Sequence, residues 1–79
     1  MRLDKFLKVS RIIKRRTVAN NACDSQHVYV NGKLSKASYE VKVGDIISVK
    51  FGDKSYDVRV LNLNEHATKE DASSMFEVV

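Results

Sequence analysis

The sequence predicts an α+β domain in which two N-terminal helices pack on a small antiparallel sheet. Apolar residues before position 26 recur at the spacing of helices. From His27 onward the period falls to about two, which is typical of half-buried strands. Asn31-Gly32 then supplies the strongest short hairpin signal in the chain. With 79 residues the chain is near the lower size limit for independent folding, so we expect a single domain over residues 1–79.

Two helices are expected before the sheet. Residues 2–13 carry an apolar stripe at helical spacing, with basic side chains on the neighbouring face. Residues 14–16 form a short connector, and Thr17 is the expected N-cap of the second helix. The apolar stripe of that helix consists of Val18, Ala19, Ala22 and Cys23. A lone cysteine on such a stripe is expected to be a buried, unreactive thiol, and it excludes an internal disulfide.

The first expected strand carries Val28 and Val30 on one face. It turns at Asn31-Gly32, returns briefly at residues 33–34 and leads into a surface loop over residues 35–40. Val41 and Val43 then lead to a second turn at Gly44-Asp45.

The second half of the chain completes the expected sheet. A strand over residues 46–51 places Ile47, Val49 and Phe51 on one face. After a turn at residues 52–54, a further strand covers residues 56–61. Thr68 and Asp71 have the spacing of a capping pair for a short helical turn, and residues 75–79 add an edge strand.

Positive charge is concentrated at the N-terminal end. The first sixteen residues hold seven basic side chains and one acid, Asp4, for a charge of +6, whereas the rest of the chain sums to −2. The seven are Arg2, Lys5, Lys8, Arg11, Lys14, Arg15 and Arg16. A concentrated field of this kind attracts polyanions and releases their counterions, which favours nucleic acid as the ligand.

Several local strings have a recognisable pattern. They are Arg2-Leu3-Asp4-Lys5-Phe6-Leu7, Lys14-Arg15-Arg16-Thr17, Val28-Tyr29-Val30-Asn31-Gly32, Lys36-Ala37-Ser38 and Val43-Gly44-Asp45-Ile46. As a set, the strings resemble the RNA-binding domain named after ribosomal small-subunit protein S-four, also called the alpha-L motif. The resemblance covers residues 1–61. It implies two helices on a partly closed sheet, with a concave basic surface for structured RNA.

Within that superfamily the chain is similar to two groups of stand-alone domains. One is the bacterial ribosome-associated quality control protein P group, and the other is the fifteen-kilodalton heat-shock proteins. The second group carries a long basic C-terminal extension, and the sequence ends at Val79 without one, which favours the first group.

The resemblance implies a set of partners. They are large-subunit ribosomal RNA, peptidyl-tRNA, the stalled large ribosomal subunit that holds it, and the tailing factor RqcH on the same particle. The implied role is support of C-terminal tailing of the stalled nascent chain. The alternatives are a heat-shock-type recycling factor, a permanent ribosomal or assembly protein, and an accessory domain of an enzyme such as a pseudouridine synthase or a tRNA synthetase.

Arginines are the strongest RNA-binding candidates because their planar fork suits phosphate oxygens. Arg2, Arg15 and Arg16 are expected to converge near the start of the second helix, whose amides add positive potential. The other basic residues of the segment, Lys5, Lys8, Arg11 and Lys14, supply unspecific phosphate attraction. Asp4, in a first helical turn, suits the helix dipole and orients a basic neighbour.

Further candidates flank the hairpin turn. Lys36 is the strongest of them as an RNA ligand, while Asn31 is more typical of a turn residue. Tyr29 either stacks on a base or packs on the sheet. The sequence indicates no catalytic motif, no metal-ligand spacing, no cofactor site and no membrane segment. We therefore expect a non-enzymatic, monomeric, cytoplasmic protein.

Overall fold

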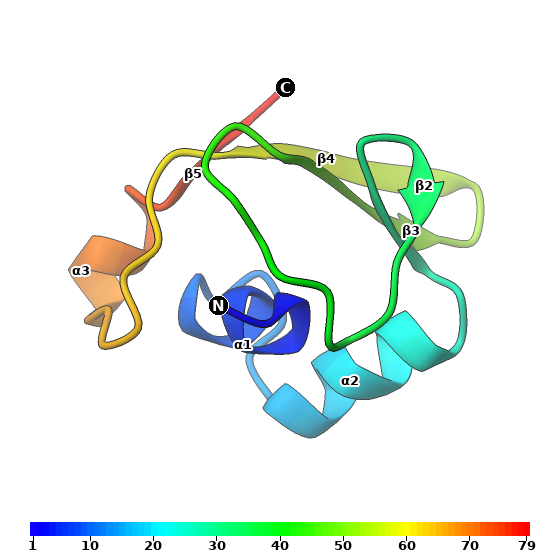
Figure 1. Cartoon of the computed structure of the whole chain (residues 1–79), viewed down its shortest axis with the longest axis horizontal. Helices are drawn as coiled ribbons and strands as arrows, with labels where there is room; N and C mark the ends of the chain where they lie inside the picture. Colours follow the sequence, from blue (N-terminus) through cyan, green and yellow to red (C-terminus); the bar gives the residue numbers. More distant parts are fainter.

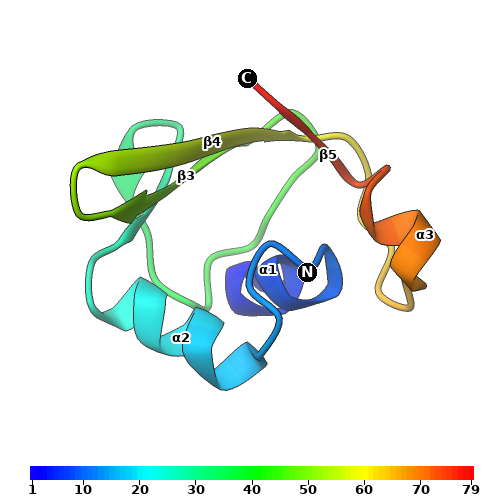
Figure 2. The ribbon, with the colours of Figure 1, turned by 180° about the vertical axis from the view of Figure 1, so that it is seen from behind.

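Three helices and five strands make up the protein in the computed structural model, which describes residues 1–79. In chain order they are α1 (Leu3–Val9), α2 (Arg16–Asp24), β1 (Val28–Val30), β2 (Lys33–Leu34), β3 (Ile46–Phe51), β4 (Lys54–Val60), α3 (Lys69–Ala72) and β5 (Phe76–Val78). The strands form one antiparallel sheet in the order β2-β1-β3-β4-β5. α1 and α2 lie together on one side of the sheet, and α3 lies beside α1 below β5 (Figures 1 and 2). The predicted fold class is confirmed.

The first helix is shorter than the sequence predicts. α1 ends at Val9, and the backbone leaves helical geometry at Arg11, whose φ is +62°. The amide of Ile13 then donates to the carbonyl of Leu7 at 3.0 Å, so the following residues close the helix and do not extend it. Ile13 is buried, as the apolar pattern indicates, but it reaches the core from this turn. Helical periodicity alone cannot show whether a buried residue belongs to the helix or to the turn that follows it.

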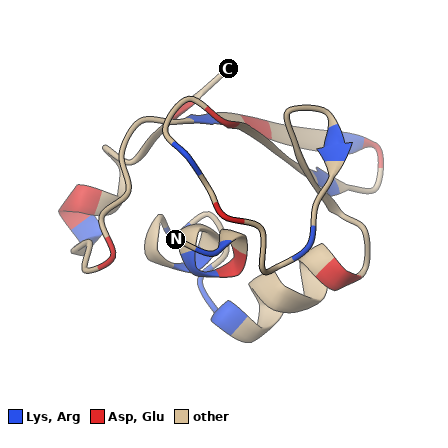
Figure 3. Ribbon diagram, viewed as in Figure 1, with Lys and Arg blue, Asp and Glu red and all other residues tan.

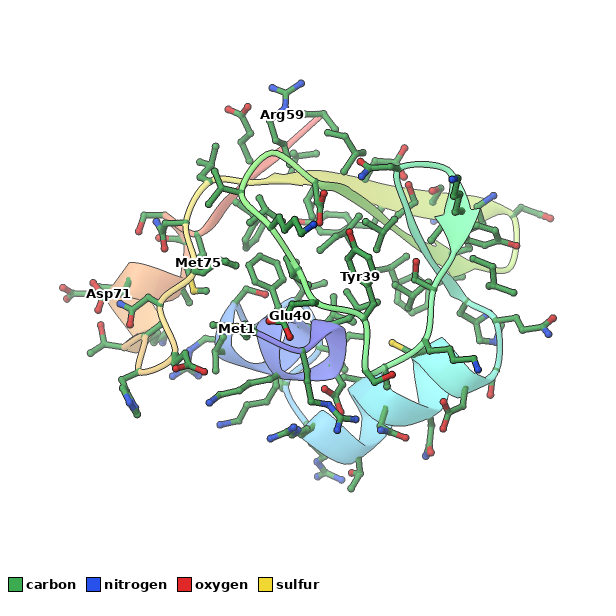
Figure 4. All side chains as sticks on the ribbon, viewed as in Figure 1. Met1, Tyr39, Glu40, Arg59, Asp71 and Met75 are labelled. Atoms are coloured by element: carbon green, nitrogen blue, oxygen red, sulfur yellow. The ribbon has the colours of Figure 1, made fainter.

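The beginning of α1 is held by a segment distant in sequence. The amide of Leu3 donates to the carbonyl of Tyr39 at 2.8 Å, and the amide of Asp4 donates to the carbonyl of Ala37 at 3.2 Å. The amino group of Met1 pairs with the carboxylate of Glu40, which lies next to it in Figure 4. These bonds give acceptors to amides at the helix start, which have no partner within the helix.

The second helix begins earlier than predicted. Arg15 is its N-cap and makes no side-chain cap, while Arg16, predicted to belong to the connector, is the first helical residue. Thr17, the predicted N-cap, lies inside the first turn and caps nothing. The prediction failed because a short polar side chain is favoured at an N-cap but is not required there.

The apolar stripe of α2 is narrower than predicted. Ala19 and Cys23 are buried at the packing with α1, but Val18 is 48% exposed. Burial, with smaller contributions from the carboxylates of Asp4 and Asp24, raises the pKa of Cys23 to about 11. The thiol therefore stays protonated near neutral pH, which agrees with the predicted unreactive cysteine.

The sheet follows the predicted alternation over most of its length. Its inward-facing side chains are Val28, Val30, Ile47, Val49, Val58 and Val60, each exposed by 3% or less. Asn31 and Gly32 have φ values of +52° and +81°, as a tight hairpin turn requires. Phe51 departs from the prediction: it is 56% exposed, at the end of the ladder where it pairs with Lys54. β4 begins at Lys54, two residues before the expected start.

The C-terminal segment closes the core. The hydroxyl of Thr68 accepts from the amide of Asp71, and the carboxylate of Asp71 accepts from the amide of Thr68, each at 3.3 Å. This capping box begins α3 as predicted. Met75 is fully buried in the main cluster and points into the molecule in Figure 4. The edge strand β5 that follows pairs with β4, which confirms the last predicted strand.

A buried carboxylate connects the two turns of the sheet. Asp45 is 8% exposed and accepts hydrogen bonds from the side-chain amide of Asn31 at 3.0 Å, the hydroxyl of Tyr39 at 2.9 Å and the amide of Lys42 at 2.9 Å. Tyr39 projects toward the sheet from the loop beside α1 (Figure 4). The side-chain oxygen of Asn31 accepts from the amide of Ile46 at 2.9 Å. Both ends of the Asn31 amide are therefore used within the protein, which agrees with its predicted role as a turn residue.

Replacing Asp45 by Ala should lower the free energy of unfolding by about 2–4 kcal/mol, because three donors lose a charged acceptor. Asp53→Ala is the matched control, since Asp53 is exposed in the turn between β3 and β4. That control should change the free energy by less than about 0.5 kcal/mol. Urea denaturation measures both, and equal losses in the two variants would show that the Asp45 bonds are unimportant.

Candidate nucleic-acid interface

The basic segment is organised around one buried carboxylate. Asp4, 2% exposed, accepts from Nε of Arg2 at 3.2 Å and from Nδ2 of Asn20 at 3.2 Å. Oδ2, which accepts from Asn20, also lies 3.5 Å from Nε of Arg16, and Oδ1, which accepts from Arg2, also accepts from the amide of Lys5 at 2.8 Å. Donors from α1, α2 and the residue before α1 thus meet at a single side chain.

These donors keep Asp4 ionised. Burial by itself would raise the pKa of this carboxyl group. The hydrogen bond from Asn20, the charge of Arg16, the backbone bond from Lys5 and the charge of Arg2 together outweigh burial, so the pKa lies below its ordinary value. The two arginines therefore face a permanent negative charge at neutral pH.

Asp4 fixes only one edge of each arginine. The side chains of Arg2 and Arg16 are each 49% exposed, and each directs Nε toward the carboxylate. A guanidinium has five N–H donors, so the remaining ones face solvent on both side chains. Two oriented guanidinium groups, one from the residue before α1 and one from α2, are suited to phosphate oxygens.

An open hollow of about 330 Å³ lies beside these arginines. Its lining residues are Asp4, Arg16, Thr17, Asn20 and Asn21. It adjoins the start of α2, where no side-chain cap is present, so the first amides of that helix lack a protein acceptor. Free amides and the helix dipole add positive potential at the same place.

A second basic group lies at the other end of α1. Lys8, Arg11 and Lys14 line a hollow of about 370 Å³ together with residues 65–67 of the loop before α3. Nζ of Lys5 lies 3.3 Å from a carboxylate oxygen of Glu65, which also lines this hollow. Figure 3 shows Lys and Arg positions on α1, on the connector and at the start of α2.

Two predicted residues do not join either group. Lys36 lines a separate hollow near the C-terminal end of α2, beside Asp24 and Leu34. Arg15 is exposed at the N-cap of α2 but lines none of the hollows. Of the three arginines expected to converge, the structure therefore brings together Arg2 and Arg16.

Tyr29 packs within the sheet. It is half-buried on β1, between β2 and β3, and Nζ of Lys50 lies 4.5 Å from the centre of its ring. A cation over a ring face is an attractive contact that occupies the surface a base would use. The sequence leaves base stacking and sheet packing open as roles for Tyr29, and the structure shows packing on the sheet.

Sequence reasoning missed Asn20, Glu65 and His66 as members of these groups. The spacing of Arg16 and Asn20, four residues apart, is a usable signal, because it places both side chains on one face of α2. Glu65 and His66 carry no such signal, since a loop brings them to α1 from 60 residues along the chain.

No three His, Cys, Asp or Glu side chains of the protein are arranged to hold a metal ion. None of its helices has the length and apolar content needed to cross a membrane.

The fold and the basic helix pair are those of an S4-domain protein, and residues 1–47 match the family model described as S4 domain. The chain is 51% identical to the RQC P-site tRNA stabilizing factor of Streptococcus pneumoniae, covering 100% of this chain and 90% of the relative. It is 50% identical to the factor of the same name in Halalkalibacterium halodurans, over 99% and 89% of the two chains. These likenesses show that the chain belongs to the family of RQC P-site tRNA stabilizing factors, as the sequence strings indicate.

A solved structure agrees with the fold. Heat shock protein 15 of Vibrio cholerae, described as trimeric, superposes with a TM-score of 0.90 at 25% identity, covering all of this chain and 81% of that one. The resemblance to heat-shock proteins expected from the sequence is thereby confirmed at the level of the fold.

Acidification should destabilise the protein through Asp4. A carboxyl group whose pKa is lowered by folding contributes stability above its unfolded pKa, 3.8, and loses it as pH falls through the folded value. The wild type should therefore lose more free energy of unfolding between about pH 5 and pH 3 than Asp4→Asn. Urea denaturation across this range tests the prediction, and parallel losses in both proteins would contradict it.

Proposed function

We propose that this chain is a non-enzymatic RNA-binding factor of ribosome-associated quality control and acts as a single S4-type domain. The observation that carries the proposal is the pair of half-exposed arginines held on buried Asp4. Because their inner edges are fixed, their outer N–H groups present an ordered surface to RNA phosphates. The uncapped start of α2 beside them adds backbone donors to the same surface.

The proposed target is a large ribosomal subunit that retains peptidyl-tRNA after stalling. The family name supports this choice, since it refers to stabilisation of a tRNA in the P site. A domain of 79 residues has a limited contact area, so contact with ribosomal RNA alone would be weak. Simultaneous contact with the trapped tRNA raises the apparent affinity through effective concentration. Holding the tRNA in this way would support C-terminal tailing of the nascent chain by the tailing factor RqcH.

Recycling of large subunits is the second candidate function. The observation that favours it is the close superposition on heat shock protein 15 over the whole chain. In both roles the protein binds a large subunit that carries peptidyl-tRNA, and they differ in whether tailing depends on the protein.

Arg16→Ala should weaken binding to large subunits by about tenfold, because it removes an oriented guanidinium that contacts phosphate. Arg2→Ala should have the same effect, more mildly. Arg59→Ala is the matched control: this arginine is also half-exposed and also pairs with a carboxylate, that of Glu77 at 2.7 Å, but it lies on β4.

Cosedimentation with purified large subunits measures the binding, and thermal denaturation measures the fold. Arg16 also touches Asp4, so a small loss of stability is expected. A large loss of stability with unchanged binding of the folded fraction would show that these arginines are structural only.

Puromycin should release the protein from large subunits isolated from cells with stalled translation. The nascent chain is transferred from the tRNA to puromycin, and the deacylated tRNA, no longer anchored by that chain, then leaves the subunit and takes one of the two RNA contacts with it. The protein is quantified on the subunits by immunoblot before and after treatment. Equal retention would instead indicate a permanent ribosomal component. A tailing assay in cells lacking the protein separates the two candidate functions, since only the first requires the protein for tailing.

A further inference from the structure

We propose that the hollow between the end of α1 and the loop before α3 is a binding site for an RNA phosphate, in which the carboxylate of Glu65 is displaced by that phosphate. This inference rests on the proposed RNA-binding function and adds a site distinct from the Asp4 arginines. The S4-domain match ends at residue 47, so three of the seven residues that line this hollow lie outside it. The loop thus adds a second wall beside the basic residues of α1 and the connector.

Three cations line one wall of the hollow. Lys8 belongs to the last turn of α1, Arg11 to the turn that follows, and Lys14 to the connector. All three side chains are exposed, and none takes part in an ion pair within the protein. The opposite wall supplies one carboxylate, Glu65, so positive charge is in excess. An enclosed group of unpaired cations attracts an anion more strongly than the same charges dispersed over a flat surface.

The backbone at Arg11 is a second, independent observation. Its φ of +62° lies in the left-handed region, where glycine or asparagine is the usual residue at a helix end. A residue with a Cβ atom is disfavoured there. The chain nevertheless has arginine at this position, and its side chain lines the hollow. Backbone strain retained at a charged residue is typical of a functional site.

Glu65 brings a negative charge to the edge of the hollow, where it pairs with Lys5 and not with the three cations of the wall. Its carboxylate lies 3.3 Å from Nζ of Lys5, and the two side chains are 57% and 31% exposed. An ion pair this accessible to water is weak. A phosphate with several oxygens can therefore replace the carboxylate and contact Lys5 as well as the three lysine and arginine side chains of the wall.

The test measures binding of the full chain to a fluorescein-labelled RNA hairpin by fluorescence anisotropy over a range of salt concentrations. Glu65→Gln removes the competing carboxylate and should tighten binding about two- to fivefold more than Glu70→Gln. Glu70 is the matched control because it is exposed on neighbouring α3, lies outside the hollow and gives the same change in net charge.

Lys14→Gln should weaken binding about fivefold more than Lys54→Gln, and should lower the slope of log affinity against log salt by about one. Lys54 lies at the start of β4, away from the hollow, and its loss changes the net charge equally. Arg11→Gly should weaken binding similarly while the melting temperature stays equal or rises, because glycine accepts the left-handed backbone. Weaker RNA binding at an unchanged or higher melting temperature would identify Arg11 as an RNA-binding residue and not a structural one.

The inference is overturned if Glu65→Gln matches Glu70→Gln, or if Lys14→Gln matches Lys54→Gln. Arg16→Ala in the same assay separates this failure from failure of the proposed function. If Arg16→Ala weakens binding while the variants of the hollow behave as their controls, only the second site is rejected. If Arg16→Ala is also without effect, both proposals are rejected.

Discussion

A carboxylate withdrawn from water must be surrounded by donors, and this requirement at Asp4 determines the arrangement of the helix pair. Arg2 and Lys5 satisfy it from the side of α1, and Arg16 and Asn20 satisfy it from α2. The two helices contribute only short apolar faces, because α1 has seven residues and α2 has nine. Removing Asp4 would leave two cations close together with no negative charge between them.

The same arrangement pre-orients the surface that we propose binds RNA. Long basic side chains lose rotational freedom when they bind a ligand, and this loss opposes binding. Arg2 and Arg16 have already lost part of that freedom through Asp4. A phosphate approaching from solvent meets N–H groups that Asp4 leaves unused, so it need not break the contacts with the carboxylate. Lys8, Arg11 and Lys14 have no such anchor, and it is the turn that ends α1 and the connector after it that bring them to one hollow.

Features carried by local pattern were predicted well from the sequence, whereas features created by distant contacts were not. The strands, the Asn31-Gly32 turn and the Thr68 capping box follow from periodicity and turn chemistry. The end of α1 was misplaced because the buried Ile13 continues the helical pattern after the backbone has turned. For the candidate site, charge density selected the segment in which Arg2 and Arg16 meet at Asp4. It could not identify which cations meet at Asp4, nor the arrival of Glu65 from the far end of the chain.

The attachment of residues 37–40 to the start of α1 has a consequence for the order in which the molecule folds. A helix of seven residues is not stable by itself in water, where isolated helices shorter than about 12 residues are marginal. During synthesis, α1 can gain its acceptors at Ala37 and Tyr39 only after the ribosome has made those residues and they have left its exit tunnel. At one stage of synthesis the nascent chain therefore carries all seven N-terminal basic residues, but folded α1 does not yet orient Arg2 and Arg16 at Asp4. Premature capture of RNA by the unfinished chain would rest on charge alone and would be correspondingly weak.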